Sequence, residues 1–120
     1  MKKATRTYST KQEKQIAKKL NGDCVPNSGA IMFGAGDVRT TAFDGDWLIE
    51  AKTKTSPSKS FTIKKEWLEK NEREAFATCC AHSALVFSFG ELHNDRQWYV
   101  LSEEEFLRLL RLNKSEDIDI

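Results

Sequence analysis

The chain has 120 residues, of which 39% are hydrophobic and 31% charged, with a formal net charge of +1. This length fits one domain covering residues 1–120, and no apolar run approaches the ~18 residues that a membrane span needs. Three cysteines without a Cys-x-x-Cys pair indicate neither a zinc site nor a disulfide framework. We therefore expect one reduced, cytoplasmic domain with no membrane partner, its cysteines buried as small apolar residues.

The small net charge hides an uneven distribution of basic residues along the chain. Within residues 1–20, Glu13 is the only acid among seven basic side chains: Lys2, Lys3, Arg6, Lys11, Lys14, Lys18 and Lys19. A second basic run has no acid between its members: Lys52, Lys54, Lys59, Lys64 and Lys65. Both runs are suited to contact with a phosphate backbone, whereas the tail after Ser102 is mostly acidic.

The N-terminal quarter predicts a mobile arm, a helix and a short strand. Residues 1–8 are polar and basic, and we expect them to be a mobile arm. A capping residue at Ser9 or Thr10 begins a helix that ends near Leu20, before an Asn-Gly pair. A strand at 23–27 follows. The loop from Ser28 to Gly36 is rich in glycine, so its backbone could approach a phosphate closely.

The stretch from Asp37 to Lys52 predicts a β-hairpin, because Asp-Gly between alternating apolar runs is a strong hairpin signal. Side chains alternate with period two along a strand. A turn with an even number of residues therefore places Asp37, Glu50 and Lys52 on one face of the sheet. The opposite face is then apolar and carries Val38, Thr40, Ala42, Trp47, Ile49 and Ala51.

Two carboxylates held close together repel each other unless a proton or a hard cation compensates them, and Mg²⁺ is such a cation. A lysine beside that ion could orient or deprotonate a water and meet the negative charge that develops on a phosphodiester. The alternative is an ordinary exposed Glu-x-Lys pair on an edge hairpin. The aspartate thirteen residues before Glu50, the turn parity and the glycine-rich loop favour the catalytic interpretation.

The second half of the chain predicts a loop, two helices and two strands. In order, these are a Ser/Pro/Lys loop at 53–59, a helix from Ile63 or Lys64 to Cys80, strands at 84–89 and 97–101, and a helix opened by a Ser102–Glu105 capping box. The first of these helices should turn Trp67, Leu68, Ala75, Phe76 and Cys79 inward. His82 and His93 are expected in loops or at a helix end, without a chemical role. Residues 114–120 are expected to be a mobile tail.

The pair formed by Asp37 and Glu50-Ala51-Lys52 resembles the PD-(D/E)xK nuclease signature. With Glu13 on the preceding helix and Ser28-Gly29 in the intervening loop, the spacing is similar to that of archaeal-type Holliday junction resolvases. The resemblance spans roughly residues 9–90. It implies an α/β fold with a restriction-endonuclease-like αβββαβ core, whose mixed central sheet is flanked by helices, plus an extra C-terminal strand and helix. A glycine, Gly36, stands where the proline of the family name would be.

The resemblance implies a Mg²⁺-dependent, structure-selective DNA endonuclease, in which Mn²⁺ would also work. Asp37 and Glu50 would bind the metal with support from Glu13. Lys52 would position the hydroxide, and Ser28 would hold the scissile phosphate. Sequence-independent DNA contacts are expected from Lys2, Lys3, Arg6, Lys14, Gly29, Lys54, Lys59, Lys64 and Lys65.

The expected substrate is a four-way DNA junction, cut by paired nicks in recombination or repair in a prokaryotic or phage-infected cell. A junction has approximate two-fold symmetry, so a homodimer is the expected partner state. Its interface would use the last strand and helix, through Trp98, Val100, Phe106, Leu109 and Leu110. Two alternatives remain open. One is a nicking or repair nuclease acting on flaps, mismatches or duplex DNA, and the other is a catalytically silent DNA-binding module.

Overall fold

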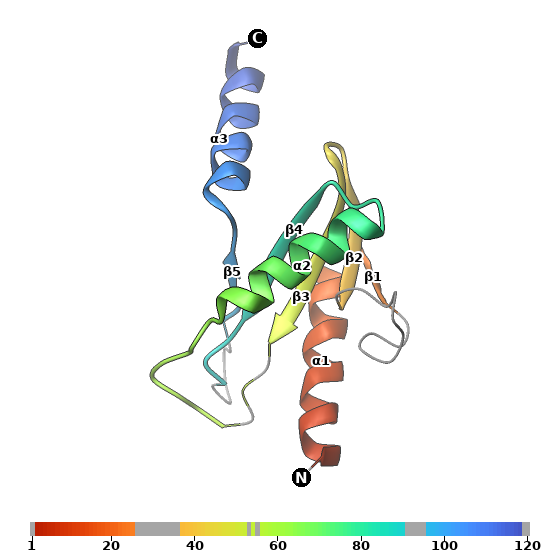
Figure 1. Ribbon diagram of the computed structural model, residues 1–120, viewed down its shortest axis with the longest axis vertical. Coiled ribbons are helices and arrows are strands. Elements are labelled where there is room, and N and C mark those ends of the chain that lie inside the picture. Colours follow the sequence, from red (N-terminus) through yellow and green to blue (C-terminus); the bar gives the residue numbers. More distant parts are fainter. Residues whose placement is uncertain (1, 26–36, 53, 55, 91–95, 119–120) are drawn as a thin grey trace.

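The computed structural model describes residues 2–25, 37–52, 54, 56–90 and 96–118, with side chains described between Lys11 and Lys114. Within these ranges the chain forms a five-stranded sheet flanked by helices (Figure 1). In chain order the elements are α1 (Lys2–Leu20), β1 (Asp23–Cys24), β2 (Val38–Ala42), β3 (Gly45–Lys52), α2 (Lys65–Ala77), β4 (His82–Phe87), β5 (Trp98–Val100) and α3 (Glu103–Ile118). This order is the one that the sequence predicted.

The strands lie in the order β1-β2-β3-β4-β5 and form a mixed sheet. β1, β2 and β3 pair antiparallel, β3 and β4 pair parallel, and β5 is antiparallel to β4. The parallel pair arises because α2 carries the chain from the end of β3 back to the start of β4, which is the usual crossover connection. The α/β class and the mixed sheet are therefore confirmed.

The β2–β3 hairpin has the predicted parity. Val38 pairs with Ile49 and Thr40 with Trp47, so these residues share one face of the sheet. The Asp-Gly signal predicts a turn at Asp44 and Gly45, but the two central residues of the turn are Phe43 and Asp44. Gly45 already belongs to β3, where it pairs with Ala42. Gly45 has a φ of +123°, which explains the glycine directly after the turn.

Two helices bury opposite faces of the sheet. α1 packs Ile16 and Ala17 onto an apolar face formed by Val38, Ile49, Ala51, Ala84 and Val86. On the other face, Leu48 forms a smaller buried cluster with Ala75 and Cys80, and Ala75 lies on α2. β4 is thus buried on both faces, as its continuous apolar run predicted.

Both terminal helices are longer than predicted. The expected start of the first helix at Ser9 or Thr10 was wrong, because helical backbone begins at Lys2. The last helix continues to Ile118 through part of the segment expected to be a mobile tail. Neither extension contains glycine or proline, so nothing in the local sequence stops the helix. In the described part of the chain, no helix is both long and apolar enough to cross a membrane.

The inward face of α2 differs from the predicted one. Asn71 and Ala75 are buried, whereas Phe76 is 87% exposed and Cys79 is also exposed. Asn71 follows Trp67 by one turn and donates a 3.0 Å hydrogen bond to the carbonyl of Ala84. The buried side of α2 therefore includes a polar residue, and Phe76, five residues after Asn71, lies outside that side. The cysteines are free, but Cys24 is exposed like Cys79, and only Cys80 is buried as expected.

Candidate active site

Asp37 directly precedes β2 and is tied to the end of β3. Its backbone N–H donates a 2.9 Å hydrogen bond to the carbonyl of Ile49. Its carboxylate Oδ2 accepts a 2.7 Å hydrogen bond from the backbone N–H of Ala51. Glu50 lies between these two anchor points. The antiparallel pairing of β2 with β3 therefore brings the two acids together although they are thirteen residues apart.

Glu50 carries the most perturbed carboxyl group of this region. Its side chain is only 17% exposed, and its Oε1 lies 3.6 Å from the Nζ atom of Lys52. Burial and the charge of Asp37 raise the pKa of Glu50 from its usual 4.5 to about 7, although Lys52 and Lys70 act in the opposite direction. The protonated form of Glu50 is thus favoured mainly by burial, and the charge of Asp37 adds to this effect.

Lys52 is positioned by elements on both sides of the sheet. Its Nζ atom lies 4.3 Å from the ring centroid of Trp67, in the first turn of α2. Its backbone carbonyl accepts a 3.1 Å hydrogen bond from the amide of Gln12 on α1. Gln12 is buried and also donates to the side chain of Gln97, at 2.9 Å. No sequence pattern pointed to Gln12, because its contacts lie 40 and 85 residues away.

Glu13 is half-buried on α1, next to Gln12. Together with Asp37 it acts on Cys24: burial, then the charge of Glu13, and more weakly Asp37 raise the pKa of that thiol. In the residues with described side chains, no three histidine, cysteine or acidic groups come together as a possible metal site. The structure therefore brings Asp37 and Glu50 together but does not place Glu13 with them as a third ligand.

The predicted DNA-contacting residues are found in different surroundings. Lys54 and Lys64 lie over aromatic rings, while the remaining lysines with described side chains are exposed: Lys14, Lys59 and Lys65. The side chains of Lys2, Lys3 and Arg6 lie outside the described residues, although their backbone belongs to α1. Ser28 and Gly29 also lie outside the described residues, so their predicted roles remain predictions.

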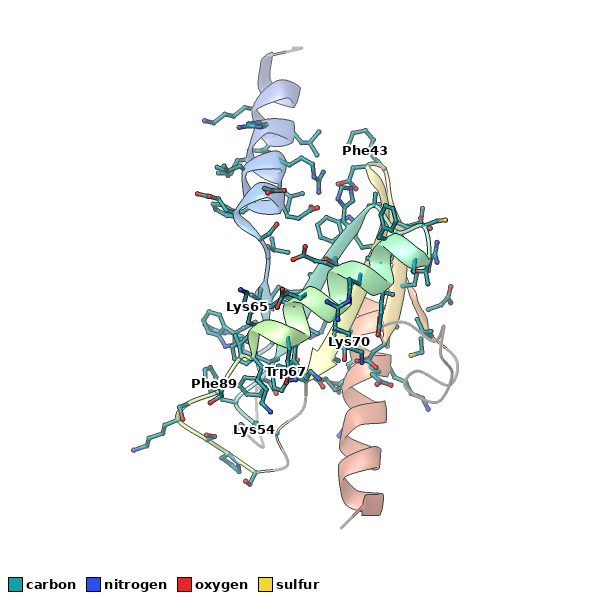
Figure 2. The ribbon with its side chains drawn as sticks, in the orientation of Figure 1. Phe43, Lys54, Lys65, Trp67, Lys70 and Phe89 are labelled. Atoms are coloured by element: carbon teal, nitrogen blue, oxygen red, sulfur yellow. The ribbon has the colours of Figure 1, made fainter. Side chains whose placement is uncertain are left out.

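An aromatic cluster beside Lys52 was not recognised in the sequence. We call it the aromatic platform, and it consists of Phe61, Trp67, Phe87 and Phe89. Its rings come from the loop before α2, from α2 itself, from the end of β4, and from the segment directly after β4. Figure 2 shows Lys54, Trp67 and Phe89 gathered near the end of β3, and Phe43 at the far tip of the hairpin. Phe87 and Phe89, two residues apart, could have indicated two rings on one face of a strand. Their closeness to Lys52 could not be predicted, because it depends on how β3 and β4 pair.

A second polar cluster joins α3 to the sheet, at the opposite end of β3. His82 was expected in a loop or at a helix end, but it is buried and is the first residue of β4. Its Nδ1 lies 2.8 Å from Glu105 Oε1, and its Nε2 lies 2.9 Å from the backbone carbonyl of Asp44. Arg108 pairs with both Glu105 and Asp44. This cluster anchors the start of α3.

Comparisons of the chain with protein-family models, curated proteins and solved structures gave no match. Membership of the PD-(D/E)xK nucleases therefore remains a prediction from the motif.

Proposed function

We propose that this chain is a Mg²⁺-dependent endonuclease that hydrolyses DNA phosphodiesters at Asp37, Glu50 and Lys52. One observation carries the proposal. The mostly buried carboxylate of Glu50 lies beside Asp37, and the Lys52 ammonium is 3.6 Å from it. Two close acids and an amine at the end of one strand pair form a donor set that suits a hard cation and a phosphate.

The residues present fit a magnesium ion. Carboxylate oxygens are its preferred protein ligands, and the ion commonly keeps several waters besides one or two carboxylates. Asp37 and Glu50 would hold it, and Glu13 could support it through water. A divalent cation would also favour the charged form of Glu50, whose pKa is raised by burial and by the charge of Asp37. When bound, Mg²⁺ would polarise the scissile phosphate and lower the pKa of a bound water.

Lys52 would meet the charge that develops on the phosphate. Hydrolysis joins a water oxygen to phosphorus and breaks one P–O bond of the backbone, and negative charge builds on the non-bridging oxygens. The Lys52 ammonium can donate hydrogen bonds to such an oxygen. The ring of Trp67 holds that ammonium next to Glu50 and limits its freedom, so less ordering is needed at the moment of reaction.

We propose a four-way DNA junction as the substrate and a two-fold homodimer as the active form. α3 extends away from the sheet (Figure 1) and exposes several large apolar side chains. Phe106 is 54% exposed and Leu110 is 42% exposed, and Trp98 on β5 is 45% exposed. A symmetric dimer through this face would present two equivalent sites, as paired nicks across a junction require. The role of β5 and α3 as a dimer interface thus remains a proposal.

Incubation with a labelled four-way junction tests this function. Wild-type protein should make symmetric paired nicks with Mg²⁺ or Mn²⁺ and none with EDTA. Glu50→Gln should remove the nicks but keep junction binding, whereas Glu69→Gln, at an exposed acid of α2, should cut like the wild type. If the wild type leaves every DNA intact but binds it, the chain is a silent binding module.

Linear duplex, mismatched duplex and flap substrates belong in the same experiment. Preferential nicking of any of these over the junction would identify the chain as a repair-type nuclease of the same chemistry. Loss of cutting in Glu50→Gln would then still support the proposed active site, and only the four-way junction would be rejected as the substrate.

A further inference from the structure

We infer that the aromatic platform stacks an unpaired base of the substrate, next to the phosphate that is cut. This inference rests on the proposed nuclease function and adds a substrate feature to it: at least one nucleotide must be outside a base pair. Phe61 and Phe87 are stacked, with ring centroids 4.5 Å apart and an interplanar angle of 23°. Trp67 lies 6.4 Å from Phe61, and Phe89 packs edge-on against Phe87 at 5.4 Å.

The platform directly adjoins the candidate active site. Phe87 on β4 is the register partner of Lys52 on β3, so both side chains point to the same face of the sheet. Glu50 pairs with Leu85 two residues earlier on that same face. A nucleotide whose phosphate contacts Lys52 could therefore place its base on the aromatic platform, because no other strand or helix lies between Lys52 and Phe87.

The loop before α2 is fixed onto the end of β4, which holds the platform together. The backbone N–H of Ser58 donates a 2.8 Å hydrogen bond to the carbonyl of Phe89. Gly90 has a φ of +78°, and a Cβ there would lie 2.6 Å from the carbonyl oxygen of Ser56 and 2.9 Å from Lys54 Cβ. Only glycine permits this close approach. It brings Lys54 close to the rings, with its Nζ atom over Phe61.

Lysines surround the rings where a buried core would have apolar neighbours. Besides Lys52 over Trp67, Lys64 lies 5.7 Å from the Trp67 ring, and Lys54 lies 5.4 Å from Phe61. The four platform residues are only partly buried, so their rings are in reach of solvent. Half-open aromatic rings combined with ammonium groups match a ligand that has both a flat aromatic part and a phosphate.

A nucleotide provides this combination, but only when its base is unpaired. In a duplex each base face is covered by the stacked neighbours, so a protein ring cannot contact it without unstacking the helix. Phosphate contact alone would need the lysines and not the rings. The rings thus predict a preference for DNA with an unpaired or opened nucleotide, such as a branch point or a bulge.

Binding measured in EDTA tests the inference separately from cleavage. Fluorescence anisotropy would compare a duplex carrying a short unpaired bulge with the fully paired duplex, for wild type and Phe61→Leu. The variant should bind the bulged DNA about 5- to 20-fold more weakly and the paired duplex equally well, because leucine keeps the apolar contact but offers no ring for stacking. Phe76→Leu, at an exposed phenylalanine on the other side of α2, should change neither. Equal losses for both DNAs, or no loss for either, would overturn the inference.

Photocrosslinking gives a second test that needs no variant. DNA with 5-iodouracil at the unpaired position would be irradiated with wild-type protein, and the crosslinked peptide identified by mass spectrometry. We expect attachment at Phe61, Trp67 or Phe89; attachment only at Phe43, Phe76 or Trp98 would contradict a base on the platform. Both tests are read without Mg²⁺. A protein that stacks the base but never cuts would therefore disprove the nuclease and leave the platform supported.

Discussion

The carboxylate of Asp37 accepts a 2.7 Å hydrogen bond from the backbone N–H of Ala51, the residue that directly follows Glu50. This bond fixes one acid beside the other. Asp37→Asn keeps an oxygen acceptor but removes the charge, so the pKa of Glu50 should fall from about 7 towards its usual value. A carboxyl ¹³C NMR titration without metal would measure it. Asp23→Asn, at an exposed acid on β1, is the control, and an unchanged Glu50 titration in Asp37→Asn would refute the coupling.

The raised pKa of Glu50 also predicts how stability depends on pH. Between about pH 4.5 and 7 the folded state keeps a proton on Glu50 that the unfolded chain has released, so stability falls as pH rises through this window and then levels. The loss attributable to Glu50 is about 3 kcal/mol, and Glu50→Gln should remove it. Urea unfolding of the metal-free protein across this range gives the difference. The exposed acid Glu66 supplies the matched variant, Glu66→Gln, which should retain the wild-type slope.

Removal of Arg108 should loosen α3. Burial opposes ionisation of Asp44, but hydrogen bonds from Arg108 and Trp47 lower its pKa, and Arg108 also pairs with Glu105. Arg108→Met removes the guanidinium that pairs with both acids, and it should cost about 1–3 kcal/mol. Hydrogen exchange should then accelerate over the first turns of α3, whereas Arg111→Met, at an exposed neighbour, should exchange normally. Unchanged protection in Arg108→Met would show that the polar cluster does not anchor this helix.

Junction binding should weaken steeply with salt, by about 10³-fold or more between roughly 50 and 200 mM if six or more phosphates are contacted. The double variant Lys54→Gln/Lys64→Gln should reduce the slope of log K against log salt by about 2, because each lost phosphate contact removes about 0.9. Lys114→Gln, on the far part of α3, should keep the wild-type slope. A flat salt response of the wild type would disprove the basic surface.

The exposed apolar face of α3 predicts self-association. Light scattering coupled to size-exclusion chromatography should give a dimer mass for the wild type and a monomer mass for Phe106→Ser/Leu110→Ser. Phe76→Ser changes an even more exposed phenylalanine on α2 and should stay dimeric. A wild-type monomer at every concentration would rule out the two-fold arrangement. Cutting by such a monomer would leave the active-site proposal intact.

Local sequence determined the hairpin and its two faces, because strand side chains alternate with period two whatever the rest of the chain does. It also predicted the element order and the burial of β4. It could not place Phe76, because apolar spacing alone did not show which side of α2 faces the sheet. Asn71 and Ala75 lie on that side, and Phe76 does not. The start of α1 and the end of α3 were also not predicted, because no glycine or proline marks them in the sequence.

The closeness of Asp37 and Glu50, thirteen residues apart, could be predicted from the hairpin, because a single turn joins the two chain segments that carry them. The tertiary structure alone decided what surrounds them. Lys52 meets Phe87 because β3 and β4 pair in parallel, and it meets Trp67 because α2 crosses that face. His82 likewise contacts Glu105 only because the first turn of α3 lies beside the start of β4. Such contacts join residues whose distance in sequence carries no periodic signal, so only the folded chain brings them together.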